Sequence, residues 1–203
     1  MALSKIQAES MNLADTYTFT GTISGTPQGL TLINQTSSST TVSSFSIDNV
    51  FSSTYQHYRV YMRVEYSSVG DGYYMRLLQS DGSERGSNYY FSMAGHGTDD
   101  TTFTGGSTNV STFYIGRHSG GDVAGGGNRG GHYIFDLYRP YVGTATNLFG
   151  EWIGYHDSND KYTAGYFRGF NSNQETHRGF KVVGNTGSSI IQHDVWVYGV
   201  TNA

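Results

Sequence analysis

The sequence predicts an all-β protein, an antiparallel β-sandwich of jelly-roll-like type with a short N-terminal anchoring arm. Three observations lead to this prediction. Short segments with a period of two recur along the chain, turn signals separate them, and no helical pattern appears after residue 14. A chain of 203 residues suits one such domain with an appendage. We therefore expect an attachment arm over residues 1–40 and a sandwich domain over residues 41–203.

The arm begins with the only segment that has a helical pattern, residues 1–14. Its large apolar side chains are Leu3, Ile6, Met11 and Leu13. A helix this short is marginal in water on its own, so packing has to hold it in place. It either folds back onto the sandwich or docks onto another chain. We favour docking, with these four residues as the attachment contacts, and we place the end of the arm in the polar run 36–44.

The clearest strand pattern is "HYRVYMRVEY" at 57–66. Alternation over these residues predicts one buried face and one face that is exposed or paired with neighbouring strands. The side chains expected in the core are Tyr58, Val60, Met62, Val64 and Tyr66, and those expected opposite are Arg59, Tyr61, Arg63 and Glu65.

The segment "YYMRLLQSDGS" is expected to pair with that strand as a hairpin partner closed by Asp81-Gly82. Residues 94–110 lack periodicity, which predicts a loop. In "HYIFDLYR" the residues Tyr133, Phe135 and Leu137 share one side. Further strands are expected in "NYYFSM", "TFYIG", "NLFGEWIGYHD" as a central strand, "YTAGYFRGF", "GFKVVG" and "IIQHDVWVYGV", the last with Ile191, His193, Val195 and Val197 on one side, for roughly nine or ten strands in all.

Charge and composition exclude several classes of partner. The formal net charge is -4 and no basic stripe is present, which argues against nucleic-acid binding and polybasic membrane docking. Without cysteine, disulfides and thiolate metal sites are impossible. The start has no basic and apolar signal-peptide pattern, and no apolar run could span a membrane, so we expect synthesis in a cytoplasm without membrane insertion.

No motif in the sequence predicts catalysis, a cofactor or a metal. A G-x-S-x-G nucleophile motif is missing, and the glycine-rich run 119–131 lacks the Lys of a phosphate-binding loop. "HDSNDKY" at 156–162 has Lys161 where a calcium loop needs a ligand. Asp136 and Asp194 lie opposite the apolar alternation, on an expected solvated face. We predict no catalytic, cofactor-binding or metal residues.

Aromatic residues make up 15% of the chain and charged residues only 14%, against roughly 25% charged in ordinary domains. Such a surface suits subunit contact and the stacking of rings on ligands. The candidates for contact with a partner or a host ligand are Arg117, His118, Trp152, Tyr155, His156 and Tyr162.

Parts of the sequence resemble structural proteins of tailed bacteriophages, especially those of marine cyanophages. The opening "MALSKIQAESMNLADTYTFTGTISG" is similar to the start of fibre-like chains, with "ALSKI", "ESMNLAD" and "FTGTISG". "SSFSIDNVFSSTYQHYRVYMRVEYSS", "MRLLQSDGSERGSNYYFS" and the final "VWVYGV" resemble a β-sandwich module of phage tail and virion proteins. The glycine-rich middle carries no part of this resemblance.

The resemblance implies a non-enzymatic protein of the virion. The leading version is a tail fibre or appendage that meets the host surface, with a surface glycan as a candidate ligand. Its partners would be other virion proteins, in the capsid or the tail, and further copies of itself in a homotrimer or another symmetric homo-oligomer. A capsid decoration protein is the structural alternative, and a glycan-active depolymerase is the alternative of another class.

Overall fold

A computed structural model describes residues 29–66, 72–97, 102–116, 130–156, 161–184 and 189–200, apart from the side chains of Tyr66, Phe103, Tyr155, His156 and Lys161. These ranges hold twelve strands and no helix, so they contain no helix able to span a membrane. The strands are β1 (Leu30–Ser38), β2 (Ser44–Ile47), β3 (His57–Tyr66), β4 (Tyr73–Gln79), β5 (Tyr89–Gly97), β6 (Thr102–Val110), β7 (Phe113–Tyr114), β8 (Gly130–Tyr138), β9 (Thr146–His156), β10 (Lys161–Asn171), β11 (His177–Gly184) and β12 (Ile190–Val200).

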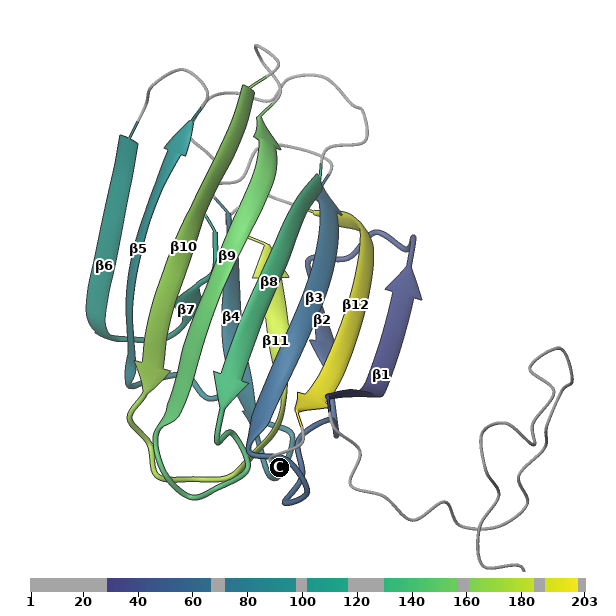
Figure 1. Ribbon diagram of the computed structural model, residues 1–203, viewed down its shortest axis with the longest axis vertical. Coiled ribbons are helices and arrows are strands. Elements are labelled where there is room, and N and C mark those ends of the chain that lie inside the picture. Colours follow the sequence, from purple (N-terminus) through teal and green to yellow (C-terminus); the bar gives the residue numbers. More distant parts are fainter. Residues whose placement is uncertain are drawn as a thin grey trace, which may run out of the picture.

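The strands form two antiparallel sheets packed as a sandwich (Figure 1). The large sheet has the order β1-β12-β3-β8-β9-β10-β5-β6, and the small sheet has the order β2-β11-β4-β7. Figure 1 shows the large sheet in front and the small sheet behind it, so the small sheet covers one face of the large one. The fold class expected from the sequence, an all-β antiparallel sandwich, is confirmed.

The core between the sheets is rich in aromatic rings. The ring centre of Phe135 on β8 lies 6.2 Å from that of Phe167 on β10 and 5.9 Å from that of Phe180 on the small sheet. Gly150, on the strand between Phe135 and Phe167, leaves the space that these two rings fill. Burial of each such side chain stabilises the fold by roughly 1.5–3 kcal/mol, so this aromatic layer is a major part of the stability.

The alternation expected for β3 is confirmed. Val60, Met62 and Val64 are buried against the small sheet. On the opposite side, Arg59 pairs with Asp136 of β8 and Arg63 with Asp194 of β12. The expected grouping of Tyr133, Phe135 and Leu137 on one side of β8 also holds, because all three are buried.

The alternation expected for β12 holds for only part of the strand. His193, Val195 and Val197 face the core, but Ile190 takes the buried position that was expected of Ile191. The reason is an irregularity in the pairing of β12 with β3 between Ile190 and Gln192, which shifts the register by one residue.

The hairpin expected between β3 and β4 is wrong. β3 pairs with β12 and β8 in the large sheet, whereas β4 pairs with β11 and β7 in the small sheet. The chain therefore crosses between the sheets after β3. The turn signal at Asp81-Gly82 does form a turn, in which Gly82 has a φ of 86° and Leu78 bridges back to Glu84.

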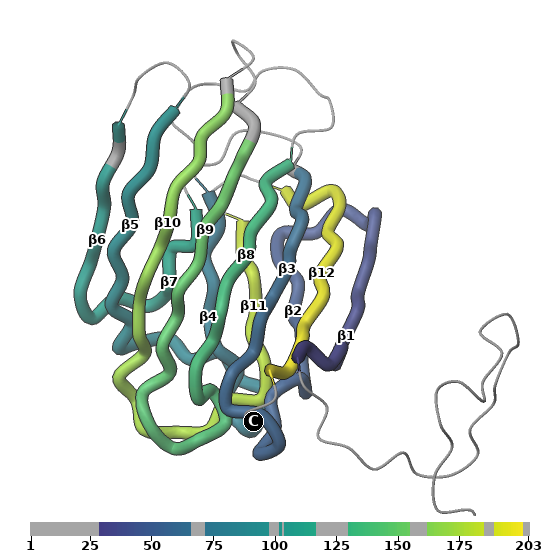
Figure 2. The backbone as a smooth tube through the Cα atoms, in the orientation of Figure 1, coloured from purple at the N-terminus to yellow at the C-terminus, as the bar shows by residue number. Residues whose placement is uncertain are grey.

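The expected boundary at residue 40 is also wrong. β1 pairs along its length with β12 and forms an edge strand of the large sheet, side by side with it in Figure 2. Residues 30–38 thus belong to the sandwich, because their backbone hydrogen bonds complete the edge of the sheet. The part of the expected arm before residue 29 lies outside the described residues.

The loop expected over residues 94–110 is replaced by strands. β5 continues to Gly97, and Thr102–Val110 forms β6 at the other edge of the large sheet. β6 lacks apolar periodicity because most of its side chains are exposed, so no alternation of burial is imposed on its sequence. The expected central position of "NLFGEWIGYHD" is confirmed, since β9 lies between β8 and β10.

Candidate functional site

Most residues singled out in the sequence fall outside the part of the chain that the structure describes. These are the arm residues Leu3, Ile6, Met11 and Leu13, the pair Arg117 and His118, and the side chains of Tyr155 and His156, whose backbone belongs to β9.

The structure places the two remaining candidates on opposite faces of the large sheet. Trp152 is only 2% exposed and its ring centre lies 6.2 Å from that of Phe167 in the core, so it is a packing residue and not a surface contact. Its position follows from β9, where Leu148, Gly150 and Trp152 all point inward. Tyr162 on β10 is 48% exposed and points away from the core.

The outer face, meaning the face of the large sheet turned away from the small sheet, carries many large apolar side chains. Strand alternation brings them there, because every second residue of β8, β9 and β10 packs in the core and those between point outward. Monomeric soluble proteins rarely expose contiguous apolar patches larger than a few hundred Å². The exposed large apolar side chains of this face are Leu30, Leu32, Ile134, Tyr138, Phe149, Ile153, Tyr162, Tyr166 and Phe170.

The outward side of the small sheet has a different character. Glu84 forms ion pairs with Arg76, at 2.6 Å, and with Lys181. The hydrogen bonds from Lys181 and Arg76 hold the pKa of Glu84 below its usual value. Arg178 is paired with Asp48, again at 2.6 Å. The sandwich is therefore two-sided, with a charged surface on the small sheet and an aromatic one on the large sheet.

A buried carboxylate lies on the outer face near the end of β8. Asp136 on β8 accepts hydrogen bonds from Arg59 Nε and Nη2, both at 2.8 Å, and its Oδ1 lies 2.9 Å from His57 Nε2. The His57 ring stacks on Tyr138, with 4.4 Å between ring centres. Burial raises the pKa of Asp136, but the hydrogen bonds and charges of Arg59 and His57 outweigh it and hold that pKa below its usual value.

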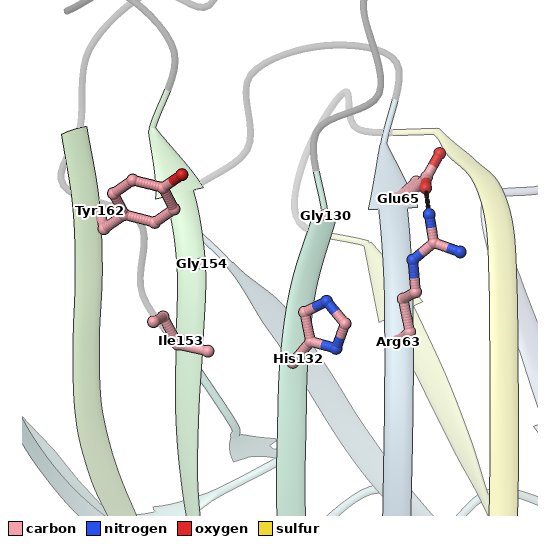
Figure 3. A pocket seen from close by; sticks show the side chains of 7 residues that line it. All are labelled: Arg63, Glu65, Gly130, His132, Ile153, Gly154 and Tyr162. Atoms are coloured by element: carbon pink, nitrogen blue, oxygen red, sulfur yellow. Dashed lines mark hydrogen bonds and ion pairs between the residues drawn. The ribbon is translucent and has the colours of Figure 1, made fainter. Parts of the chain in front are cut away.

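A hollow of about 440 Å³, here called the upper hollow, lies at the end of the face where β8 begins (Figure 3). On one side stand Arg63 and Glu65 of β3, which form an ion pair. His132 of β8 lies in the middle, and Ile153 and Tyr162 close the other side. Arg63 also reaches Asp194 at 3.4 Å. The charges that the structure describes here are therefore paired within the protein.

Three further hollows lie on the same face. Two of them, of about 560 and 550 Å³, adjoin the upper hollow and share His132 with it. One holds Tyr61 and Tyr198, whose rings pack edge to face with centres 5.7 Å apart. The other holds Glu151. The outer face is thus grooved across most of its width.

The fourth hollow, of about 490 Å³, lies apart from the others toward β5 and β6. Here the Arg168 guanidinium sits 5.0 Å from the centre of the Phe149 ring and 5.3 Å from that of Tyr166. Next to them the rings of Tyr90 and Phe170 stack in parallel, with centres 4.6 Å apart. Rings and a single cation are gathered here from three neighbouring strands.

The sequence alone did not reveal this face, and the reason is local. β10 carries aromatic residues on both sides, with Phe167 buried between the exposed Tyr166 and Arg168 and Phe170 exposed beyond them. Alternation shows which residues share a side but cannot tell which aromatic side is the core. The signal that was available is the double-sided aromatic pattern itself, in "YTAGYFRGF".

Metal binding has no support among the described residues, which contain no group of three His, Cys, Asp or Glu side chains able to hold an ion. Comparison with protein-family models, curated proteins and solved structures finds no match for this chain.

Proposed function

We propose that this chain is a non-enzymatic structural protein of a tailed-phage virion, most simply a tail fibre or appendage that meets the host surface. The segment before β1 attaches it to another virion component, and the sandwich is displayed outward. The observation that carries the proposal is the outer face of the large sheet, a grooved aromatic surface on a sandwich whose other side is charged. The sequence resemblance described above supplies the virion context.

The size of the outer face supports a role in contact. The large sheet has eight strands about 4.8 Å apart, and its central strands have 11 residues at about 3.4 Å per residue. The face of the sheet therefore covers roughly 1,200 Å². A stable protein interface takes about 800 Å² from each partner. The face therefore has room for a symmetric contact with further copies of the chain, as in a homotrimer, and for a ligand groove at its edge.

A binding role is better supported than a glycan-hydrolysing one. Glycoside hydrolysis needs a carboxylic acid with a raised pKa beside a second carboxylate. Asp136, a buried carboxylate of the outer face, has the opposite property, because Arg59 and His57 hold its pKa below the usual value.

Quantitative mass spectrometry of particles purified from a lysate of the natural host tests the proposal. We expect the chain in purified particles at roughly tens of copies or fewer, the number typical of a symmetric tail appendage. Hundreds of copies would assign it to capsid decoration instead. Its absence from particles that contain the major capsid protein would overturn the virion role.

A truncated chain tests the attachment segment. Removal of residues 1–14 should leave the far-ultraviolet circular dichroism spectrum of the sandwich unchanged, because every strand of the two sheets lies after residue 29. We expect the truncated chain to be missing from particles. Normal incorporation would move the attachment surface onto the sandwich.

A further inference from the structure

The hollow around Arg168, which we call the Arg168 groove, has the make-up of a small-ligand site. Its volume of about 490 Å³ lies within the range of roughly 300–1,000 Å³ that ligand sites occupy. The rings of Tyr90, Phe149 and Phe170 line it, and the amide of Asn147 and the guanidinium of Arg168 provide polar groups. Phe149 and Phe170 are 46% and 39% exposed, so their apolar surface is available to a ligand.

Arg168 differs from the other strand arginines of the outer face. Arg59 is held by Asp136, and Arg63 is held by Asp194 and Glu65. Within the described ranges Arg168 has no carboxylate partner, and its guanidinium contacts the rings of Phe149 and Tyr166. Its positive charge is therefore not compensated by a protein anion.

Contact with rings leaves this guanidinium able to bind an anion. Its central carbon lies near the rings of Phe149 and Tyr166, and no ion pair or hydrogen bond with a described residue engages its five N–H groups. Such a group matches a carboxylate in a two-pronged hydrogen-bonded pair. The two rings also fix the position of the side chain, which lowers the entropy lost when a ligand binds.

We propose that the Arg168 groove binds a saccharide that carries a carboxylate, such as a uronic acid or a sialic acid residue. The carboxylate pairs with Arg168, the apolar C–H surface of the sugar packs on Phe149 and Phe170, and the sugar hydroxyls bond to Asn147 and to Thr108 on β6. This assignment rests on the proposed function, in that a displayed sandwich meets host-surface glycans.

The geometry favours a saccharide over a peptide or a nucleic acid. A peptide that adds as a strand needs a free sheet edge. The strands that carry Arg168 and the rings, β9, β10 and β5, each have neighbours on both sides, and of the lining strands only β6 lies at an edge. A nucleic acid needs several cations along its backbone, whereas this groove has a single one in a chain of net charge -4. One cation among rings, an amide and hydroxyls fits a sparsely charged sugar.

The test uses the full-length chain and two matched pairs of probes in isothermal titration at low salt and pH 7. The first pair is trigalacturonic acid and its methyl ester, and the second is sialyllactose and lactose. In at least one pair we expect the acid to bind about tenfold or more tightly than its neutral counterpart. Arg168→Gln should remove that preference, and Phe149→Ala should weaken binding of both members of the pair.

The matched control is Arg139→Gln, at an exposed arginine that lines none of the four hollows. It should bind as the unmodified chain does. Equal binding of acid and neutral probes in both pairs, or a preference that survives in Arg168→Gln, overturns the proposal. A melting temperature within about 2 °C of the unmodified chain shows that each variant is folded.

The result of this titration can be distinguished from the result of the particle analysis that tests the virion role. A chain that is present in particles but shows no preference for acidic sugars refutes the groove alone. A chain that is absent from particles refutes the virion role, while the titration still decides whether Arg168 binds the carboxylate.

Discussion

Replacement of Gly150 by alanine would place a methyl group in a closely packed part of the core. The new Cβ would lie 2.5 Å from Phe135 Cβ, 2.5 Å from Phe167 Cζ and 2.8 Å from the Ile134 carbonyl oxygen. Ordinary contacts of this kind are 3.4–4 Å. The Phe167 ring can move, but the other two atoms belong to β8, which is hydrogen-bonded to β3 on one side and β9 on the other.

The expected cost follows from two opposing effects. Overpacking of a core by one methyl group destabilises the fold by about 1–3 kcal/mol. The loss of glycine entropy from the unfolded chain gives back about 0.4–1 kcal/mol, because Gly150 has no positive φ that alanine would strain. We expect a net loss of about 1–2 kcal/mol in the free energy of unfolding, or a drop of roughly 2–8 °C in melting temperature.

Urea unfolding followed by circular dichroism measures this change. The matched control is Gly86→Ala, because an added Cβ at Gly86 meets nothing within 4 Å and its φ is not positive. Gly86→Ala should leave the free energy of unfolding unchanged or slightly raised. If Gly150→Ala is as stable as Gly86→Ala, then β9 does not pack closely between Phe135 and Phe167 as described.

Three further predictions concern charge and protonation. Met62→Asp should lower the free energy of unfolding in urea by about 3 kcal/mol or more, because it places an unpaired charge in the core. Tyr61→Asp on the outer face should lower it much less. Equal losses would mean that β3 turns its other side to the core. Burial lowers the pKa of His177 from 6.5 to about 4, so the unfolded chain binds the extra proton between these values. The free energy of unfolding should therefore fall by about 2 kcal/mol from pH 8 to pH 5 on account of His177, and His177→Phe should remove that part of the slope; an unchanged slope would contradict this. Asp136→Asn should cost about 1–3 kcal/mol at pH 7 because Arg59 loses its carboxylate. Since the pKa of Asp136 is lowered, that cost should vanish as the pH falls through the folded-state pKa, and a cost that persists in acid would mean that the ion pair is not its source.

The sequence by itself determined the fold class and the facing of the best-patterned strands. β3 could be assigned because its two sides differ in chemistry, with Val60, Met62 and Val64 on one side and arginines on the other. A period of two specifies which residues share a side, and strong contrast between the sides specifies which one is buried. Gly82 likewise marked a real turn, since its positive φ is a local requirement.

Pairing partners were decided only by the tertiary structure. β4 was expected beside β3 because the two are neighbours in the chain, but the inward faces of both are apolar and they meet across the core instead of along an edge. β1 and β12 pair although more than 150 residues separate them. Such non-local pairing depends on how all the strands of the chain can pair with one another, and a local sequence pattern does not contain that information.

The candidate site was also decided by the tertiary structure. Trp152 seemed to be a surface aromatic in the sequence but is buried, whereas Phe149 and Arg168 attracted no notice and are exposed. The physical reason is that β9 and β10 carry rings on both sides, so hydrophobicity does not distinguish the core from the outer face. Only the small sheet makes that distinction, because it covers one side of the large sheet and leaves the rings around Arg168 uncovered.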